Sequence, residues 1–306
     1  MSENREIEIT VDENEAGQRL DAFLSGKIPD VSRNYIQKLI EDNLVLVNGQ
    51  STKAKVRTYP GMKITVYVPQ PEPLRVKPEN IPLDIVYEDS DILIINKPRN
   101  MVVHPAPGNE DNTLVNAVLY HCGDSLSDIN GIIRPGIVHR IDKDTTGLIA
   151  VAKNNKAHQS LALQLKEHSM KRVYDAIVEG IIREDRGVID APIGRHPVDR
   201  KKMAVVPGKG KEAITHFEVL ERLKGATYVR LRLETGRTHQ IRVHMAYINH
   251  PVYGDPLYGR STKKLTGGQM LHARFLRLKH PTTGEYMEFE AELPEDFIKL
   301  LDFLRD

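Results

Sequence analysis

The sequence predicts an α+β protein with two parts: a small α+β unit near the N-terminus and a larger unit built on a mixed, largely antiparallel sheet. Short apolar strands occur beside amphipathic helices, without the regular strand–helix–strand repeat of a parallel sheet. Several strands in the second half alternate apolar and polar residues, which is typical of a sheet with one face in solvent. The stretch PQPEPLRVKPENIP at 69–82 holds five prolines and predicts a stiff linker.

Composition narrows the class of protein. The chain has 306 residues, 40% hydrophobic and 28% charged, with a formal net charge of +1, so it has the composition of an ordinary globular protein. Cys122 is the single cysteine, which excludes an intrachain disulfide and a cysteine-based zinc site. The acidic N-terminus has no apolar leader, and no apolar run approaches the ~20 residues that span a bilayer. We therefore expect a cytoplasmic protein without a membrane partner.

We expect three segments: an acidic one at 1–14, a small domain at 15–75 and a large domain at 76–306. In the small domain, helices are predicted over GQRLDAFLSGKI and over SRNYIQKLIEDN, the second capped by Ser32. LVLVNGQ ends in Asn48-Gly49, a strong hairpin signal, and MKITVYV supplies another strand. Five basic residues of this domain are expected on one surface: Arg33, Lys38, Lys53, Lys55 and Arg57.

The large domain is predicted element by element from its periodicity. The strands are DILIINKP, GLIAVAK, KRVYDAIVEG, THFEVLERL, ATYVRLRLETG, QMLHARFLRL and EYMEFEAEL. The helices are Asn154 to about Glu167, THQIRVHMAYIN capped by Thr238, and PEDFIKLLDFL.

One polar stretch of the large domain is a candidate for chemistry. In GIVHRIDKDTTGLIAVAK, residues 136–153, charged groups lie between two apolar segments. Asp142 comes just before a predicted strand, where a rigid scaffold can hold a side chain at the mouth of a pocket. A surface turn with self-satisfied charges explains the stretch equally well from chemistry alone. Motifs for a nucleophile elbow, a zinc protease or a phosphate loop are absent, and His239 and His244 are not spaced as a ligand pair on a helix.

Two resemblances decide between these interpretations. The order helix–turn–helix–strand around SRNYIQKLIEDNLVLVNGQ resembles the small alpha-L RNA-binding domain named after a ribosomal small-subunit protein. GIVHRIDKDTTGLIAVAKN resembles the catalytic motif of the pseudouridine synthases that modify large-subunit ribosomal RNA, in the branch typified by synthase D. KRVYDAIVEG, ETGRTHQIRVHMAYINHPVYGDPLYG and LHARFLRLKHP resemble further segments of that family, in the same order. Ile141 stands where many relatives have leucine.

The resemblance implies a role for each matching residue. It makes Asp142 the catalytic aspartate and Tyr174 the aromatic residue that packs on the reacting base. It makes Arg242 the basic partner of the aspartate, with Arg237 as a weaker candidate for that role. Arg140 is expected to fill the gap left in the RNA helix by the displaced nucleotide.

The expected function is isomerisation of specific uridines to pseudouridine in large-subunit ribosomal RNA, alone or within a pre-ribosomal large subunit. No cofactor, metal or obligatory protein partner is expected, because the isomerisation neither oxidises nor adds anything. The alternatives are a synthase for other ribosomal or transfer RNA uridines, and a non-catalytic RNA-binding or ribosome-assembly protein. A third alternative is a glycosidase-like hydrolase that uses Asp142 and Asp144.

Overall fold

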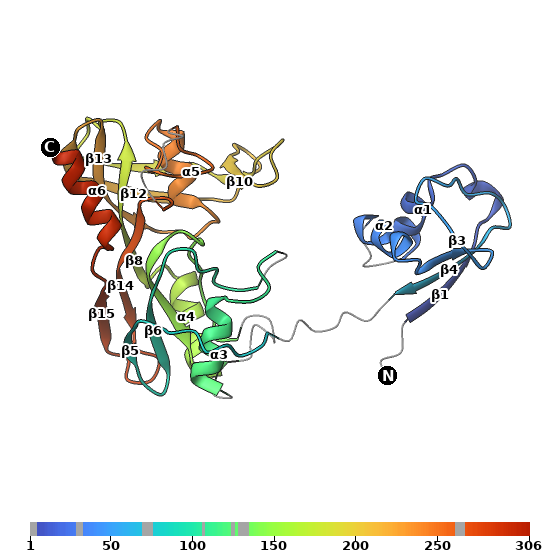
Figure 1. The fold of residues 1–306 in the computed structure, drawn as a ribbon, viewed down its shortest axis with the longest axis horizontal. Helices are drawn as coiled ribbons and strands as arrows, with labels where there is room; N and C mark the ends of the chain where they lie inside the picture. Colours follow the sequence, from blue (N-terminus) through green and yellow to red (C-terminus); the bar gives the residue numbers. More distant parts are fainter. Residues whose placement is uncertain are drawn as a thin grey trace. The chain divides into compact units, whose positions relative to one another are not determined.

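The computed structural model describes residues 5–28, 33–68, 76–105, 108–123, 126–127, 135–260 and 267–306. The chain separates into two units, 1–73 and 74–306, which are described in turn (Figure 1). Ser32, predicted as a helix cap, lies outside the described residues, as do residues 69–75 of the predicted linker with the expected boundary at 75. Among the described helices, none has the length and apolar character needed to cross a membrane.

The smaller unit packs two helices on a four-stranded antiparallel sheet. The strands are β1 (Arg5–Thr10), β2 (Val45–Val47), β3 (Gln50–Ser51) and β4 (Lys63–Val68), in the order β1-β4-β2-β3. A 3-10 turn, η1 (Glu13–Glu15), precedes the helices α1 (Leu20–Lys27) and α2 (Arg33–Glu41). The core is formed by buried apolar residues of both helices, such as Leu24 and Ile36, together with Ile64 and Val66 of β4. Asn48 and Gly49 both have positive φ, as the predicted hairpin turn requires.

Strand β1 corrects the expected segment at 1–14. Residues 5–10 pair with β4 over their whole length and so belong to the sheet of the small unit. Glu6 and Glu8 are exposed, whereas Ile7 and Ile9 pack against its core. The alternation of acidic and apolar residues over 6–9 is a strand pattern. The prediction used the acidic composition of the segment and not this alternation.

The larger unit is built on a nine-stranded sheet in the order β5-β6-β7-β14-β8-β13-β12-β9, with β15 paired to β14. Its strands are β5 (Ile85–Glu88), β6 (Ile92–Lys97), β7 (Thr146–Ala152), β8 (Lys171–Glu179), β9 (Arg186–Asp190), β12 (Ile214–Leu223), β13 (Ala226–Leu233), β14 (Leu271–Lys279) and β15 (Tyr286–Glu290). A separate hairpin joins β10 (Ile193–Arg195) and β11 (Met203–Val205). Only β7 and β14 pair in parallel within this described sheet, so the predicted mixed, largely antiparallel α+β class is confirmed.

Four helices cover the two faces of this sheet. α3 (Leu114–Cys122) and α5 (Gln240–Tyr247) share one apolar core, and α4 (Asn155–Lys166) and α6 (Glu295–Arg305) belong to others. Alternate residues of β6 divide between the cores, since Leu93 and Ile95 pack with α3 while Ile92 and Ile94 pack with α4. The helix α6 lies along β12 and β13 at the red end of the chain in Figure 1.

The helix ends agree only in part with the prediction. Asn154 caps α4 as expected, because its side chain accepts a hydrogen bond from the backbone of Ala157. The expected cap of α5 is wrong: the N-cap is His239, in the left-handed conformation, and not Thr238. Helix α3 was not predicted from the sequence, although Thr113 forms a capping box with Asn116 at its start.

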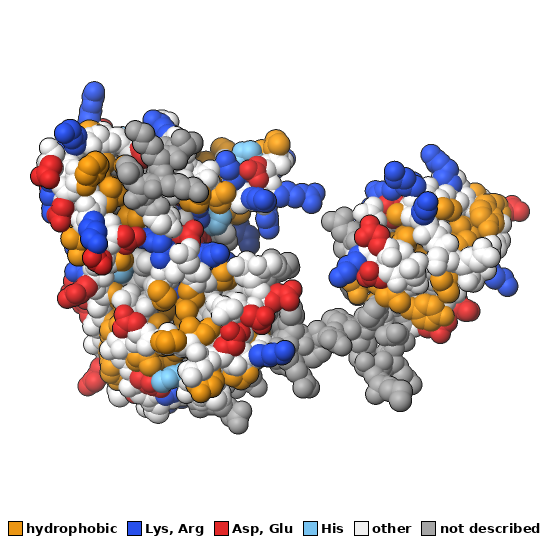
Figure 2. Space-filling model, in the orientation of Figure 1, with side chains coloured by type: hydrophobic (Ala, Val, Ile, Leu, Met, Phe, Trp, Pro, Cys, Tyr) orange, Lys and Arg blue, Asp and Glu red, His pale blue; other side chains and the backbone are white. Residues whose placement is uncertain are grey.

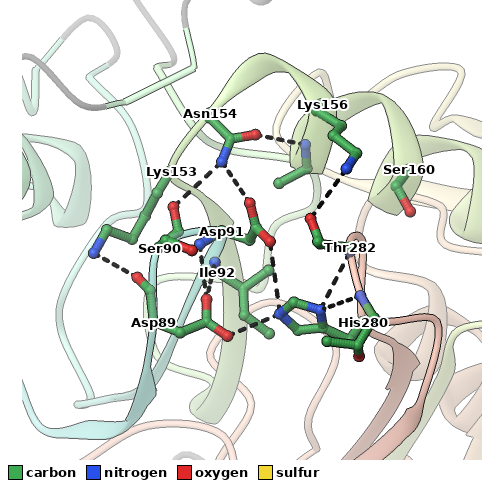
Figure 3. Close-up of polar contacts among 12 residues, drawn as sticks. Asp89, Ser90, Asp91, Ile92, Lys153, Asn154, Lys156, Ser160, His280 and Thr282 are labelled. Carbon is green, nitrogen blue, oxygen red and sulfur yellow. Dashed lines mark hydrogen bonds and ion pairs between the residues drawn. The ribbon is translucent and has the colours of Figure 1, made fainter.

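A polar cluster fixes the edge of the larger unit at the turn between β5 and β6 (Figure 3). Asp89 accepts hydrogen bonds at 2.8 Å from the backbone of Asp91 and Ile92, and another at 2.8 Å from Nε2 of His280, beyond β14. Asn154, at the start of α4, donates to Asp91 at 2.7 Å. The cluster therefore joins two turns and a helix start, and its groups are satisfied by one another.

The close approach of β7 to β14 gives a test of this fold. Gly147 has φ +103°, and a Cβ built on it would lie 2.3 Å from the carbonyl oxygen of Ala273. Gly147→Ala should lower the free energy of unfolding of the larger unit by about 3 kcal/mol, because both strain and overlap must be relieved. Chemical denaturation measures the change. Gly225→Ala, between β12 and β13 of the same unit, is the control: its φ is +70°, but its Cβ meets nothing within 4 Å, so it adds strain without overlap. An unaffected Gly147→Ala would contradict the packing described.

Candidate active site

A cavity of about 560 Å³ opens on the sheet face that carries α5. Its wall is made by the loop 138–142, by β8, by the end of β13 and by residues 235–242. All four residues predicted as the site of chemistry line it: Arg140, Asp142, Tyr174 and Arg242. Tyr174 and Arg242 lie 32 and 100 positions after Asp142 in the sequence. The volume is within the range of about 300–1,000 Å³ typical of ligand sites.

Backbone tethers fix the loop that carries Asp142. The buried ammonium of Lys97, at the end of β6, donates to the carbonyl of Lys143 at 3.0 Å, besides those of Pro98 and Met101. Arg99 donates to the carbonyls of Asp144 and Gln269, both at 2.8 Å. The loop is therefore held from two sides by buried donors, which a catalytic side chain on a turn requires.

Asp142 and Arg242 form an ion pair at the cavity wall. Oδ2 of Asp142 accepts a hydrogen bond from Nη1 of Arg242 at 2.8 Å, and the carboxylate is 18% exposed. Its other oxygen, Oδ1, lies 3.8 Å from Nε2 of His239. One carboxylate oxygen is thus held by the guanidinium, and the second is left for a ligand in the cavity.

Asp255 fixes Arg242 from behind. Its carboxylate accepts two hydrogen bonds from the guanidinium, at 2.7 and 2.9 Å, and is fully buried. Burial alone would lower the pKa of Arg242, but the hydrogen bonds of Asp255 and the charge of Asp142 raise that pKa above its ordinary value. Arg242 therefore stays charged, and Asp142 faces a permanent cation.

Tyr174 and Arg140 differ in their exposure. Tyr174, on β8, is 6% exposed, and burial raises the pKa of its hydroxyl, so it offers the cavity a neutral ring. Arg140 is exposed at the edge of the loop, and its Nη1 lies 3.2 Å from Nε2 of His104. The buried ring of Tyr174 therefore suits contact with a flat ligand, and the exposed side chain of Arg140 suits contact with a ligand beyond the cavity.

Arg237, the weaker candidate, and His139, the neighbour of Arg140 in the sequence, both have other partners. Arg237 lines the cavity, but its Nε donates to the carbonyl of Glu212 at 2.8 Å. His139 accepts a hydrogen bond from the backbone of Ala150 at 3.0 Å, and burial lowers its pKa to about 3. His139 is therefore a neutral side chain that holds the backbone of β7. The side chain of Asp144 does not line the cavity.

The basic residues of the small unit are not equivalent. Arg33 is paired with Asp21, which is fully buried and also binds Arg19 and Gln37. Lys38, Lys53, Lys55 and Arg57 are exposed, although Arg57 also donates to the carbonyl of Gly17 at 2.6 Å. In the larger unit, Lys and Arg side chains gather over the hairpin of β10 and β11 (Figure 2), where Arg195, Arg200 and Lys201 are exposed.

Sequence reasoning missed Asp255, His239 and Tyr258. The only signal for them was their place within ETGRTHQIRVHMAYINHPVYGDPLYG. The contacts of Arg242 with Asp255 and of His239 with Tyr258 join residues 13 and 19 positions apart, which local periodicity does not predict. Among the described residues, one group of three possible metal ligands occurs, Glu88 with His121 and Cys122. Glu88 already pairs with His121 at 2.8 Å and with Lys153 at 2.7 Å, so this group has no free carboxylate oxygen.

Comparison with known proteins shows which families the sequence and the fold are similar to. The profile of the RNA pseudouridylate synthase family matches residues 91–247, and that of the S4 domain matches residues 18–63. An RNA pseudouridine synthase of Bacillus subtilis is 54% identical, with 98% of each chain covered. Ribosomal large subunit pseudouridine synthase D of Escherichia coli is 45% identical over 100% of this chain and 96% of its own. The solved human RNA pseudouridylate synthase domain containing 1 is 30% identical with a TM-score of 0.59, covering 77% of this chain and 90% of its own.

The buried pair behind the cavity can be tested directly. Asp255→Ala should lower the free energy of unfolding of the larger unit by about 3–5 kcal/mol, because it leaves the guanidinium of Arg242 buried with one partner. Denaturant unfolding followed by circular dichroism gives the value. Asp185→Ala removes a pair with Arg222 in which the carboxylate is 82% exposed, and should cost below about 1 kcal/mol. Equal losses in the two variants would show that Asp255 has no special structural role.

Proposed function

The chain belongs to the RNA pseudouridine synthase family, and we propose that it isomerises uridines of large-subunit ribosomal RNA, with Asp142 as the catalytic residue. The observation that carries the proposal is the pair of Asp142 and Arg242 at 2.8 Å in the wall of a ligand-sized cavity. An isomerase of this kind breaks the bond between C1′ and N1, turns the base and joins C5 to C1′.

A carboxylate held in this way suits the reaction. An ionised carboxylate can attack the nucleotide or stabilise an oxocarbenium-like sugar, and the guanidinium of Arg242 fixes the orientation of this one. Oδ2 is bound by Arg242, so we assign the reaction to the other oxygen, Oδ1. The two-carboxylate hydrolase is disfavoured because the second carboxylate, Asp144, does not line the cavity.

Tyr174 and Arg140 are proposed to handle the displaced nucleotide. A base within RNA structure has to be flipped out, at a cost of a few kcal/mol for unstacking. The buried ring of Tyr174 in the cavity wall suits stacking on the flipped uracil. Arg140 is exposed beside Asp142, so it suits a role in filling the vacancy in the RNA.

The substrate class is proposed from the relatives and from the small unit. Relatives that are 45–47% identical over almost the whole chain are ribosomal large subunit pseudouridine synthases D. We assign RNA binding to residues 15–75, which include the S4 match, and chemistry to residues 76–306. An enzyme with this substrate acts in the cytoplasm, on free ribosomal RNA or on a pre-ribosomal subunit. Other ribosomal or transfer RNA uridines are the alternative substrates.

Replacing the proposed catalytic carboxylate tests this function. Asp142→Asn keeps the shape of the side chain but removes the charge, so single-turnover pseudouridine formation on large-subunit RNA should fall by at least about 10³-fold. RNA affinity should stay within a few-fold. Asp144→Asn is the matched control and should retain turnover. Normal turnover in Asp142→Asn would refute the assignment, and loss in both variants with release of uracil would favour the hydrolase.

The role of the small unit is tested through salt. Lys53 and Lys55 are exposed, so if they contact phosphates their joint replacement by Gln should reduce the slope of log affinity against log salt by about two units. The single-turnover rate at saturating RNA should stay within a few-fold. Lys299→Gln, on the surface of α6, is the control. An unchanged affinity and slope would show that these two lysines do not bind RNA.

A further inference from the structure

His239 occupies an unusual position at the start of α5. Seven described residues other than glycine have positive φ; five are asparagines, and the other two, His168 and His239, both line the cavity. Although His239 is the N-cap of α5, its side chain makes no capping hydrogen bond. Its imidazole instead lies between Tyr258 and Asp142. A strained backbone at a cavity suggests a functional reason for the position of this side chain.

A chain of hydrogen bonds fixes the imidazole. The backbone N–H of Met203, on β11, donates to the hydroxyl oxygen of Tyr258 at 2.8 Å, and this hydroxyl lies 2.9 Å from Nδ1 of His239. Nε2 faces the carboxylate oxygen Oδ1 of Asp142 at 3.8 Å. A lone pair on Nε2 would be repelled by this oxygen. The favoured arrangement is therefore a Tyr258 hydroxyl that donates to Nδ1 and an N–H on Nε2.

The surroundings keep this imidazole neutral. Burial lowers the pKa of His239, and the cations of Arg242 and Arg140 lower it further. The carboxylates of Asp142 and Asp255 act in the opposite direction but do not reverse the shift. At neutral pH, His239 is therefore a neutral donor of one hydrogen bond into the cavity.

We propose that His239 is a further catalytic residue, whose Nε2–H donates a hydrogen bond to a carbonyl oxygen of the uracil while the base is detached from the sugar. This inference rests on the proposed function. The distance of 3.8 Å from Oδ1 is too long for a direct hydrogen bond, so the N–H is unused by the carboxylate and remains for a ligand that lies against both groups.

The chemistry requires such a donor. When the bond between C1′ and N1 breaks, its electron pair leaves with the base, and the charge spreads over N1 and the carbonyl oxygens. A ring electron pair then forms the bond between C5 and C1′, the hydrogen of C5 leaves as a proton, and N1 gains a proton. The atoms balance without an oxidant or reductant. The hydrogen bond of His239 stabilises the anion and transfers no proton, as a neutral imidazole donor can.

Three variants test the proposal by single-turnover rate at saturating RNA and by RNA affinity. His239→Ala should slow the reaction by about 10²-fold with affinity within about threefold, because one donor to a developing anion is lost. His239→Gln keeps an N–H donor and should recover at least about tenfold of that loss. Tyr258→Phe removes the hydroxyl that donates to Nδ1, so the proton of the imidazole is no longer fixed on Nε2. This variant should slow the reaction by about tenfold. His121→Ala, exposed on α3 outside the cavity, should match the wild type.

The pH profile adds a readout that a structural role would not change. The ratio of the wild-type rate to the His239→Gln rate should stay constant from about pH 7 to 9, because a neutral donor does not titrate there. A wild-type advantage that shrinks as the pH rises would mean an imidazolium acid and would refute the proposal. So would equal losses for Ala and Gln, or an unaffected rate in His239→Ala. If His239→Ala does not fold, the Gln and Tyr258→Phe variants decide.

Failure of this inference is separable from failure of the proposed function. If Asp142→Asn is inactive and His239→Ala is fully active, only the role of His239 is wrong. If Asp142→Asn remains active, the assignment of the reaction to Asp142 is wrong, and the role of His239 has no basis.

Discussion

The guanidinium of Arg242 is the interaction on which the candidate site depends, because it is shared between two carboxylates. Asp255 and Arg242 are almost completely buried and balance each other's charge. Asp142 contributes the additional negative charge, and its side chain, at 18%, is the most exposed of the three. A buried pair of this kind gives little net stability, so its value lies in a fixed orientation for the third group.

The rest of the larger unit serves to bring these groups together. Asp142 and Arg242 are 100 positions apart in the chain, and Asp255 lies 13 positions further on. The parallel pairing with β14 fixes the position of the first residues of β7, which follow Asp142 in the chain. Lys97 and Arg99 hold the backbone of the loop that carries Asp142. Reorganisation of the site during the reaction is thereby limited, which is how a preformed electrostatic site lowers a barrier.

Local patterns in the sequence predicted most of the strands and helices, because period and capping depend on neighbouring residues. Asn154 as the cap of α4 is a clear case. The predicted cap of α5, Thr238, was wrong, because the residue at the N-cap is His239 in a left-handed conformation, and its side chain contacts Tyr258 from a later part of the chain. Similarly, the ion pair of Arg33 with the buried Asp21 could not be predicted from the distribution of charges along the sequence. Asp142, Tyr174 and Arg242 were identified through family resemblance, since no local rule brings them into one cavity.

The central claim is that this chain isomerises uridine with its own side chains around Asp142. The most direct measurement is nucleoside analysis of protein-free large-subunit RNA and of precursor subunits, each incubated with the full-length protein in the presence of a metal chelator. We expect pseudouridine at discrete positions of at least one substrate, with no free uracil released. Release of uracil, or an absence of pseudouridine in both substrates, would contradict it.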